Sequence, residues 1–246
     1  GLGAGGTYTA VMDELTRHAN RIPGTASFES CLRAVESELN SAGIATHRQV
    51  YASHIPVTRE CRLEVNGERI TDIFPLSPNG IMPMSTGVQD LRGHLLFLGD
   101  GTYEEMNGHE IRGSIAMLNV SSPNVEKVFS QGARAVILVG DGRFDRNRIR
   151  RHLNHLLFSL PKAYMPREAA ERRGLLQRGE PVPARLRIIQ NWQNVDAVNL
   201  WAYLPPVSPR EFNLGREEAL VLSAPLSTTG LVPDRSPGNR QAANAA

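Results

Sequence analysis

The amino-terminal part of the chain shows helical spacing first and strand-like alternation afterwards. Apolar residues recur every three or four positions in "YTAVMDELTRHANR" (residues 8–21) and in "SFESCLRAVESELNSAG" (residues 27–43), which predicts two helices. Ser27 is placed to cap the second helix, and Gly43 is placed to end it. The next segment, "IATHRQVYAS" (residues 44–53), alternates like a strand. We therefore expect a helix-helix-strand unit.

From about residue 61 the pattern changes to short apolar runs separated by turns. "RLEVNGERI" (residues 62–70) holds an Asn-Gly pair between two strand-like runs, which is typical of a tight β-hairpin. Further strands are predicted at residues 94–101 and 114–120, a helix followed by a buried strand at 124–141, and a helix after a proline at 165–179. This alternation of helices and strands favours an α/β or α+β fold over a β-sandwich.

Two more strands are predicted near the carboxyl end. They are "NVDAVNLWAYLP" (residues 194–205) and "EALVLSAPLS" (residues 218–227), and the tail beyond residue 230 is polar and contains prolines. We find no internal repeat. The strand-like residues 219–224 run into a turn rich in Ser, Thr, Pro and Gly, a place where many enzymes carry catalytic side chains.

Composition and charge limit the functional classes. The 246 residues are 41% hydrophobic and 21% charged with a net charge of +2, which predicts globular domains and gives no basis for nucleic-acid binding. No stretch approaches the roughly 18 apolar residues of a membrane span. The sequence begins "GLGAGG" without a leader, so we expect a trimmed amino terminus and an extracytoplasmic location. Cys31 and Cys61 are expected to be free thiols.

Several segments together resemble the M28 family of zinc-dependent aminopeptidases and carboxypeptidases that carry an inserted protease-associated (PA) domain. "RIPGTASFESCLRAVESELNSAGIATHRQVY" is similar to the family's opening, and "NVDAVNLWAYLP" to its second core strand. "LRGHLLFLGDGTYEEMNGHEIRGSIAMLNVSS", followed by "VEKVFSQGARAVILVGD", resembles the PA module. The resemblance implies an α/β fold: a partial M28 peptidase-like αβα core at residues 1–60 and 191–246, with a β-rich PA domain inserted at 61–190.

The resemblance also implies that the zinc-binding residues are absent. In the family the third core strand ends in Ala-His-x-Asp-Ser, which supplies a zinc ligand and an orienting aspartate, and a Pro-Gly-Ala-x-Asp-Asn turn supplies a bridging carboxylate. Here Pro225, Ser227 and Gln241 take those three positions. Zinc binds imidazole, thiolate or carboxylate, and none of these three side chains offers such a group, so the three ligand positions are degenerate. The family's remaining ligands and its general base fall beyond Ala246.

The expected function is therefore a non-catalytic one. We expect no catalytic residue, no bound metal and no cofactor, and instead association with a protein partner chain or self-association, as in a pseudoenzyme or a subunit of a larger assembly. The alternative is a fragment or subunit of an active M28-type zinc aminopeptidase. A third possibility is a glycan-binding surface protein that uses the PA module as a spacer, although aromatic residues make up only 6% of the chain.

Other candidate sites give weaker signals. His152 and His155 share one predicted helix face but lack a third ligand nearby. The arginine-rich residues 143–151 form the only concentrated basic patch, with one interleaved aromatic residue. The acidic residues of the loop at 100–110 depart from the ligand spacing of an EF-hand. No Gly-x-Ser-x-Gly motif accompanies the serines near the carboxyl end.

Overall fold

The computed structural model of this chain describes residues 4–78, 82–141, 160–177, 181–205, 220–228 and 230–236. The chain divides into two compact units. The helical unit comprises Gly1–Ile55, Asn194–Thr229 and Arg235–Ala246, and the sheet unit comprises Pro56–Gln193 and Gly230–Asp234. The boundaries expected at residues 60 and 190 fall inside two continuous strands, β1 (Thr46–Val65) and β8 (Val182–Ala202).

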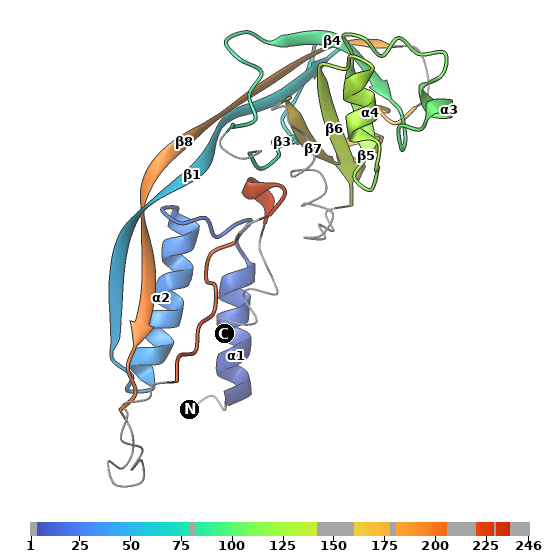
Figure 1. Cartoon of the computed structure of the whole chain (residues 1–246). Helices are drawn as coiled ribbons and strands as arrows, with labels where there is room; N and C mark the ends of the chain where they lie inside the picture. Colours follow the sequence, from blue (N-terminus) through green and yellow to red (C-terminus); the bar gives the residue numbers. More distant parts are fainter. Residues whose placement is uncertain are drawn as a thin grey trace. The chain divides into compact units, whose positions relative to one another are not determined.

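In the helical unit, α1 (Ala4–Thr16) and α2 (Ala26–Ser41) lie side by side (Figure 1). Their contact is apolar and is formed by Val11, Leu15 and Cys31, which are all buried. The two predicted helices are confirmed with shifted bounds, since both begin and end earlier than the predicted ranges of 8–21 and 27–43. The first ends at Thr16, so that His18 lies beyond its last turn.

The cap of α2 differs from the expectation. Thr25, and not Ser27, is the N-cap residue, and its Oγ1 accepts a hydrogen bond from the backbone N–H of Phe28 at 3.3 Å. The hydroxyl of Ser27 instead pairs with that of Thr25 at 2.9 Å. A side chain caps the free N–H groups of the first turn from the residue that precedes the helix. Ser27 lies inside the first turn, so Thr25 is the N-cap. Gly43 follows the helix in a left-handed conformation, as expected.

The sheet unit is built on a mixed sheet in which neighbouring strands follow the order β2-β1-β8-β4-β5-β6-β7-β3. Strands β4, β5, β6 and β7 pair in parallel. Strand β2 pairs antiparallel with β1, β3 with β7, and β8 with β4. The elements are β2 (Glu68–Ile70), β3 (Phe74–Pro75), β4 (Leu91–Phe97), α3 (Tyr103–Met106), β5 (Ile115–Asn119), α4 (Val125–Ser130), β6 (Ala135–Gly140), β7 (Lys162–Pro166), α6 (Arg167–Glu171) and a 3-10 turn at Pro233–Arg235.

Local sequence signals explain most of the sheet unit. Asn66 and Gly67 both have positive φ and join β1 to β2 with Val65 opposite Glu68, which confirms the predicted hairpin. Strands β5 and β6 are almost wholly buried, and β6 is buried along its whole length, as a continuous apolar run predicts. The helix predicted at 165–179 is shorter, because Gly174 takes a positive φ at 65° soon after α6.

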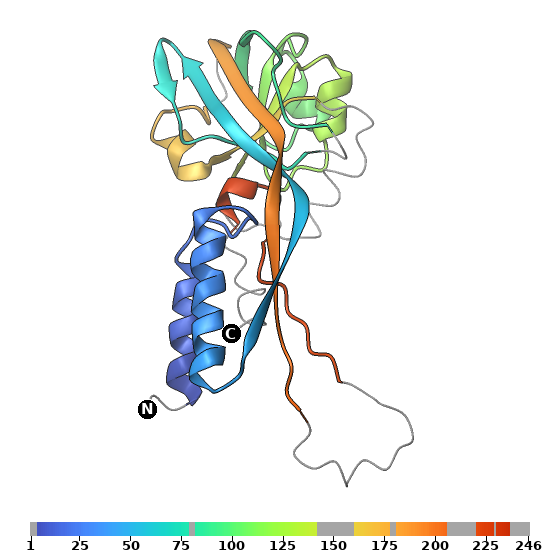
Figure 2. The same cartoon turned by 90° about the vertical axis from the view of Figure 1, so that its left-hand side faces the viewer.

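The fold class is α/β, as predicted, with a central mixed sheet. The strand predicted at residues 218–227 is wrong over its described part, because residues 220–227 adopt no regular structure. The stretch runs as an irregular trace in Figure 2, and the side chains of Leu220, Val221 and Leu222 are exposed. None of the helices in the described ranges is long and apolar enough to cross a membrane. Cys31 and Cys61 are both free, as expected.

Candidate functional site

The segment of residues 220–228, here called the site loop, contains two of the three positions that the sequence singled out. Pro225 in this loop is exposed and Ser227 is half-buried, whereas Gln241 lies outside the described residues. The loop has no His, Cys, Asp or Glu. It offers only hydroxyl and carbonyl oxygens, which are poor ligands for zinc, and therefore does not fit a zinc centre.

Arg21 fixes one end of the site loop. Its side chain is fully buried, and its guanidinium donates from Nε to the carbonyl of Leu226 at 2.9 Å and from Nη1 to the carbonyl of Leu15 at 2.6 Å. Thr228 binds the backbone of Arg21. The Thr228 hydroxyl accepts from the Arg21 backbone N–H at 3.0 Å, and the Thr228 backbone N–H donates to the Arg21 carbonyl at 3.1 Å. The loop backbone at 226–228 is thus held in one position.

The same guanidinium caps the carboxyl end of α1. Leu15 lies in the last turn of this helix, where carbonyl groups have no partner within the helix. A buried cation at a helix carboxyl end is also favoured by the helix dipole. Burial lowers the pKa of Arg21 from its ordinary value, and the hydrogen bonds to backbone oxygen compensate for the loss of water. Arg21 therefore joins α1 to the site loop.

The other end of the site loop is an exposed apolar stretch. Leu220, Val221 and Leu222 are 88%, 80% and 87% exposed. Large side chains are also exposed near the end of β8, where the Trp201 ring stacks on His47 with centroids 4.5 Å apart. Single exposed apolar residues are common, but three consecutive ones that pair with no strand in the described ranges form a surface available for binding.

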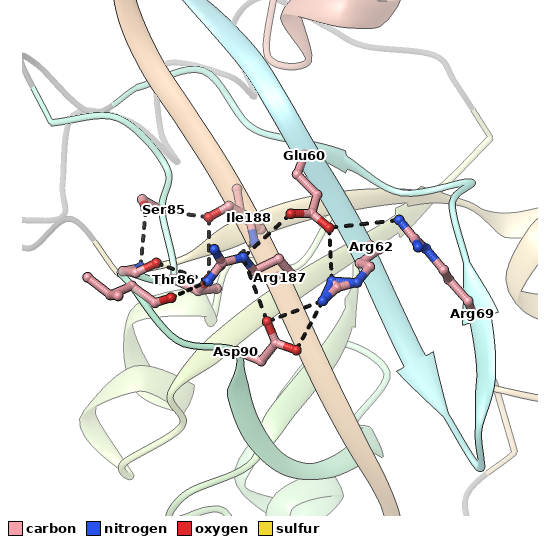
Figure 3. A network of polar contacts seen from close by, with 10 residues as sticks. Glu60, Arg62, Arg69, Ser85, Thr86, Asp90, Arg187 and Ile188 are labelled. Carbon is pink, nitrogen blue, oxygen red and sulfur yellow. Dashed lines mark hydrogen bonds and ion pairs between the residues drawn. The ribbon is translucent and has the colours of Figure 1, made fainter.

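A network of charges in the sheet unit serves a structural purpose (Figure 3). Arg62 on β1 binds Glu60 at 2.9 Å and Asp90, just before β4, at 3.1 Å. Arg187 on β8 lies 3.6 Å from Glu60 and 3.7 Å from Asp90, and donates to the Val88 carbonyl at 2.7 Å. Arg69 on β2 is a third arginine and lies 3.8 Å from Glu60. The network of three arginines and two carboxylates therefore ties β1, β2, β8 and the segment before β4 together.

The weaker candidates of the sequence do not form sites in the described residues. In the acidic loop, the Glu105 side chain completes a capping box with Thr102, and Asp100 accepts from the Asn119 side chain at 2.8 Å. These carboxylates have structural partners and do not gather around a common point. His152, His155 and the arginine-rich residues 143–151 lie outside the described residues.

One group of side chains was missed by the sequence reasoning. Glu14, His18 and Cys31 each offer one ligand atom, and these atoms lie within 4.8 Å of one another. The spacing of Glu14 and His18 by four residues is the usual signal for two side chains on one helical face, but Cys31 comes from the next helix and has no such signal. Arg21 was also missed as an anchor.

Comparison with solved structures identifies the fold. A structure of BSAP, a zinc aminopeptidase from Bacillus subtilis, matches with a TM-score of 0.55 and 17% identity over 80% of this chain and 46% of that one. A second structure of BSAP matches with a TM-score of 0.53 and 18% identity over 83% of this chain and 48% of that one. The fold is that of these aminopeptidases. A Peptidase M28 precursor from Shewanella amazonensis matches with a TM-score of 0.47 and 13% identity, over 79% and 49%.

The fold shared with the zinc aminopeptidase BSAP agrees with the resemblance seen in the sequence. The chain spans about half the length of these matched structures. No family model matches the sequence, and no curated protein matches it either.

Proposed function

We propose that this chain is a non-catalytic, M28 peptidase-like protein that acts through protein association, with the sheet unit as a PA-like inserted domain. The observation that carries the proposal is the run of three exposed apolar residues at 220–222, in a loop whose other end is held by Arg21. A loop fixed at one end presents its apolar residues at lower conformational cost than a free one. An extracytoplasmic location belongs to the same proposal.

The occupant that best fits this surface is a second copy of the chain. Leu220 and Leu222 flank Val221 symmetrically. If two copies pair antiparallel about a two-fold axis at Val221, each Leu220 lies opposite a Leu222 and both unpaired backbones gain a hydrogen-bonded neighbour. Exposed strand-like segments of this kind associate readily edge to edge. The chain would thus act as a subunit of a homodimer.

The chemistry of the site loop supports the non-catalytic part of the proposal. By resemblance, Pro225 and Ser227 replace a zinc ligand and its orienting aspartate, and Gln241 replaces a bridging carboxylate. Proline has no donor atom, and serine and glutamine are neutral. Metal-assisted hydrolysis needs a positioned water with a lowered pKa, which these residues cannot provide.

The association is tested by charge placed at its centre. We expect the wild-type chain to sediment as a dimer, and Val221→Asp to raise the dissociation constant about 100-fold, which corresponds to about 3 kcal/mol for burying an unpaired carboxylate. Val88→Asp is the matched control, because Val88 is also a valine and is 93% exposed in the sheet unit. It should leave the dimer intact.

Sedimentation velocity over a concentration series measures this, and circular dichroism checks that both variants fold. Since Val221 is exposed, the monomer should melt at the same temperature in both variants. A wild-type chain that stays monomeric at every concentration would overturn the association, and so would equal dissociation by Val88→Asp.

The alternative, a fragment or subunit of an active zinc aminopeptidase, has one observation in its favour, namely that the chain spans only about half of the matched structures. We expect no hydrolysis of aminoacyl p-nitroanilides by the wild-type chain with added zinc. The triple variant Pro225→His, Ser227→Asp, Gln241→Asp should also be inactive, because the family's other ligands and general base are not among these residues. Turnover by the wild-type chain would support the alternative, and turnover by the triple variant alone would show that the three residues are the whole defect.

A further inference from the structure

The Glu14, His18 and Cys31 side chains meet where the end of α1 contacts α2. His18 Nε2 lies 3.3 Å from Glu14 Oε1, and the three ligand atoms lie within 4.8 Å of one another. Cys31 is fully buried, whereas the side chains of Glu14 and His18 are 18% and 23% exposed. The group is thus closed toward the helix contact and open toward solvent on one side.

The types of donor fit a zinc ion. Zinc binds thiolate at about 2.3 Å and imidazole or carboxylate at about 2.0–2.2 Å, so that tetrahedral ligand atoms lie about 3.3–3.8 Å apart. The three atoms here need to move by only about 1 Å to reach that spacing. A set of one sulfur, one nitrogen and one oxygen favours zinc and similar transition metals over magnesium and calcium, which prefer oxygen alone.

The surroundings hold the carboxylate in place and keep it charged. Ser30, next to Cys31 on α2, donates from its hydroxyl to Glu14 Oε1 at 2.8 Å. Burial acts to raise the pKa of Glu14, but hydrogen bonds from Ser30 and His18 and the charge of Arg17 outweigh it and hold the pKa below its ordinary value. An outer hydrogen bond of this kind orients a metal ligand.

A cation already occupies part of this space. Arg17 Nε lies 3.0 Å from Glu14 Oε2 and 3.4 Å from His18 Nε2, so it contacts two of the three ligand residues. The Arg17 side chain is 61% exposed and is free to turn into solvent when a dication replaces it. Burial raises the pKa of the Cys31 thiol, against which the charge of Arg21 acts, so a metal must displace the thiol proton.

We propose that Glu14, His18 and Cys31 form a zinc site that joins the end of α1 to α2. Three protein ligands leave the fourth position for water or for a ligand from another molecule. The site uses none of the positions that the M28 resemblance assigns to zinc, and it does not depend on the proposed self-association. A bound zinc ion ties Cys31 in the helix contact to His18, which lies beyond the last turn of α1.

Cobalt(II) titration of the full chain tests this site, because a cobalt-thiolate bond gives a near-ultraviolet charge-transfer band that zinc abolishes. We expect one cobalt per chain with this band. Cys31→Ser should remove the band, and His18→Gln should weaken binding about tenfold or more. The matched controls, Cys61→Ser and His47→Gln, should leave band and affinity unchanged. Arg17→Ala should strengthen binding, because it removes the competing cation.

The cobalt titrations of the wild type and the variants can overturn the zinc site. Absence of the band in the folded wild-type chain overturns the site, as does its loss in Cys61→Ser with retention in Cys31→Ser. Because Cys31 is buried, Cys31→Ser is checked for folding by circular dichroism, and the partly exposed His18→Gln provides a variant that is expected to fold in any case. Unchanged affinity in both His18→Gln and Arg17→Ala also overturns it.

Discussion

Replacement of Arg21 by alanine is expected to destabilise the helical unit by about 3–5 kcal/mol. Each buried acceptor left without a donor costs about 1–3 kcal/mol, and here the Leu15 and Leu226 carbonyls both lose their donor. The removed side chain also leaves a cavity beside Leu15. Urea denaturation in a Trp192→Phe background measures the effect, because Trp201 then reports on the helical unit alone.

The control for this experiment is Arg33→Ala. The Arg33 side chain is 71% exposed and pairs with Glu29 one helical turn away, an arrangement worth only about 0.5 kcal/mol. If Arg21→Ala were no more destabilising than Arg33→Ala, the anchoring of the site loop by Arg21 would be refuted.

Replacement of Lys162 by methionine is expected to stabilise the sheet unit at pH 7. Lys162 on β7 is fully buried, and its Nζ has no hydrogen-bond partner within the described ranges. Burial lowers its pKa to about 8 from the ordinary value of 10.5. A difference of this size between folded and unfolded chains corresponds to about 3 kcal/mol, which is the upper limit of the expected gain.

The free energy of unfolding depends on pH through the Lys162 amine. Below pH 8 the amine is charged in both states, and the full cost of burying the charge is present. Between pH 8 and 10.5 the folded chain has lost the Lys162 proton and the unfolded chain still binds it, so the contribution of Lys162 to stability rises with pH in this window. Above 10.5 the amine is neutral in both states, and the cost is gone.

Lys162→Met should abolish this rise. Trp192 fluorescence in a Trp201→Phe background follows the sheet unit during urea denaturation at each pH. The control is Lys127→Met, which removes the only other lysine of the chain, an exposed one placed over the Tyr103 ring. That variant should keep the rise, and a stability difference between Lys162→Met and wild type that stays constant from pH 8 to 10.5 would contradict the prediction.

The parts of the fold that could be predicted from the sequence are those with a strong local signal. The Asn66-Gly67 turn, the apolar run of β6 and the periodic apolar face of α2 each depend on neighbouring residues only, and each is present. The length of β1 was not predicted, because its middle carries polar residues and a proline that broke the apparent alternation. Pairing in a sheet overrides such local preferences.

The strand expected at residues 218–227 failed for the opposite reason. Its apolar alternation is a property of the segment, whereas a strand also needs a partner with free backbone groups, and residues 220–227 pair with none in the described part of the chain. The same limit applies to the candidate site. Pro225 and Ser227 could be singled out from a resemblance, but the contact between Arg21 and Leu226 joins residues 205 positions apart, and no local pattern records it.

That separation has a consequence for how the chain matures during synthesis. Most of the sheet unit is one continuous stretch, Pro56–Gln193, and it can condense as soon as that stretch has left the ribosome. The helical unit must wait for Leu226, the acceptor of the Arg21 guanidinium, and for Thr228, the acceptor of the Arg21 backbone N–H. At about 5–20 residues per second, its first two helices spend on the order of ten seconds or more without the Leu226 acceptor. During that interval a nascent chain exposes the α1–α2 pair to chaperones, because the helical unit cannot close before residues 226–228 are made.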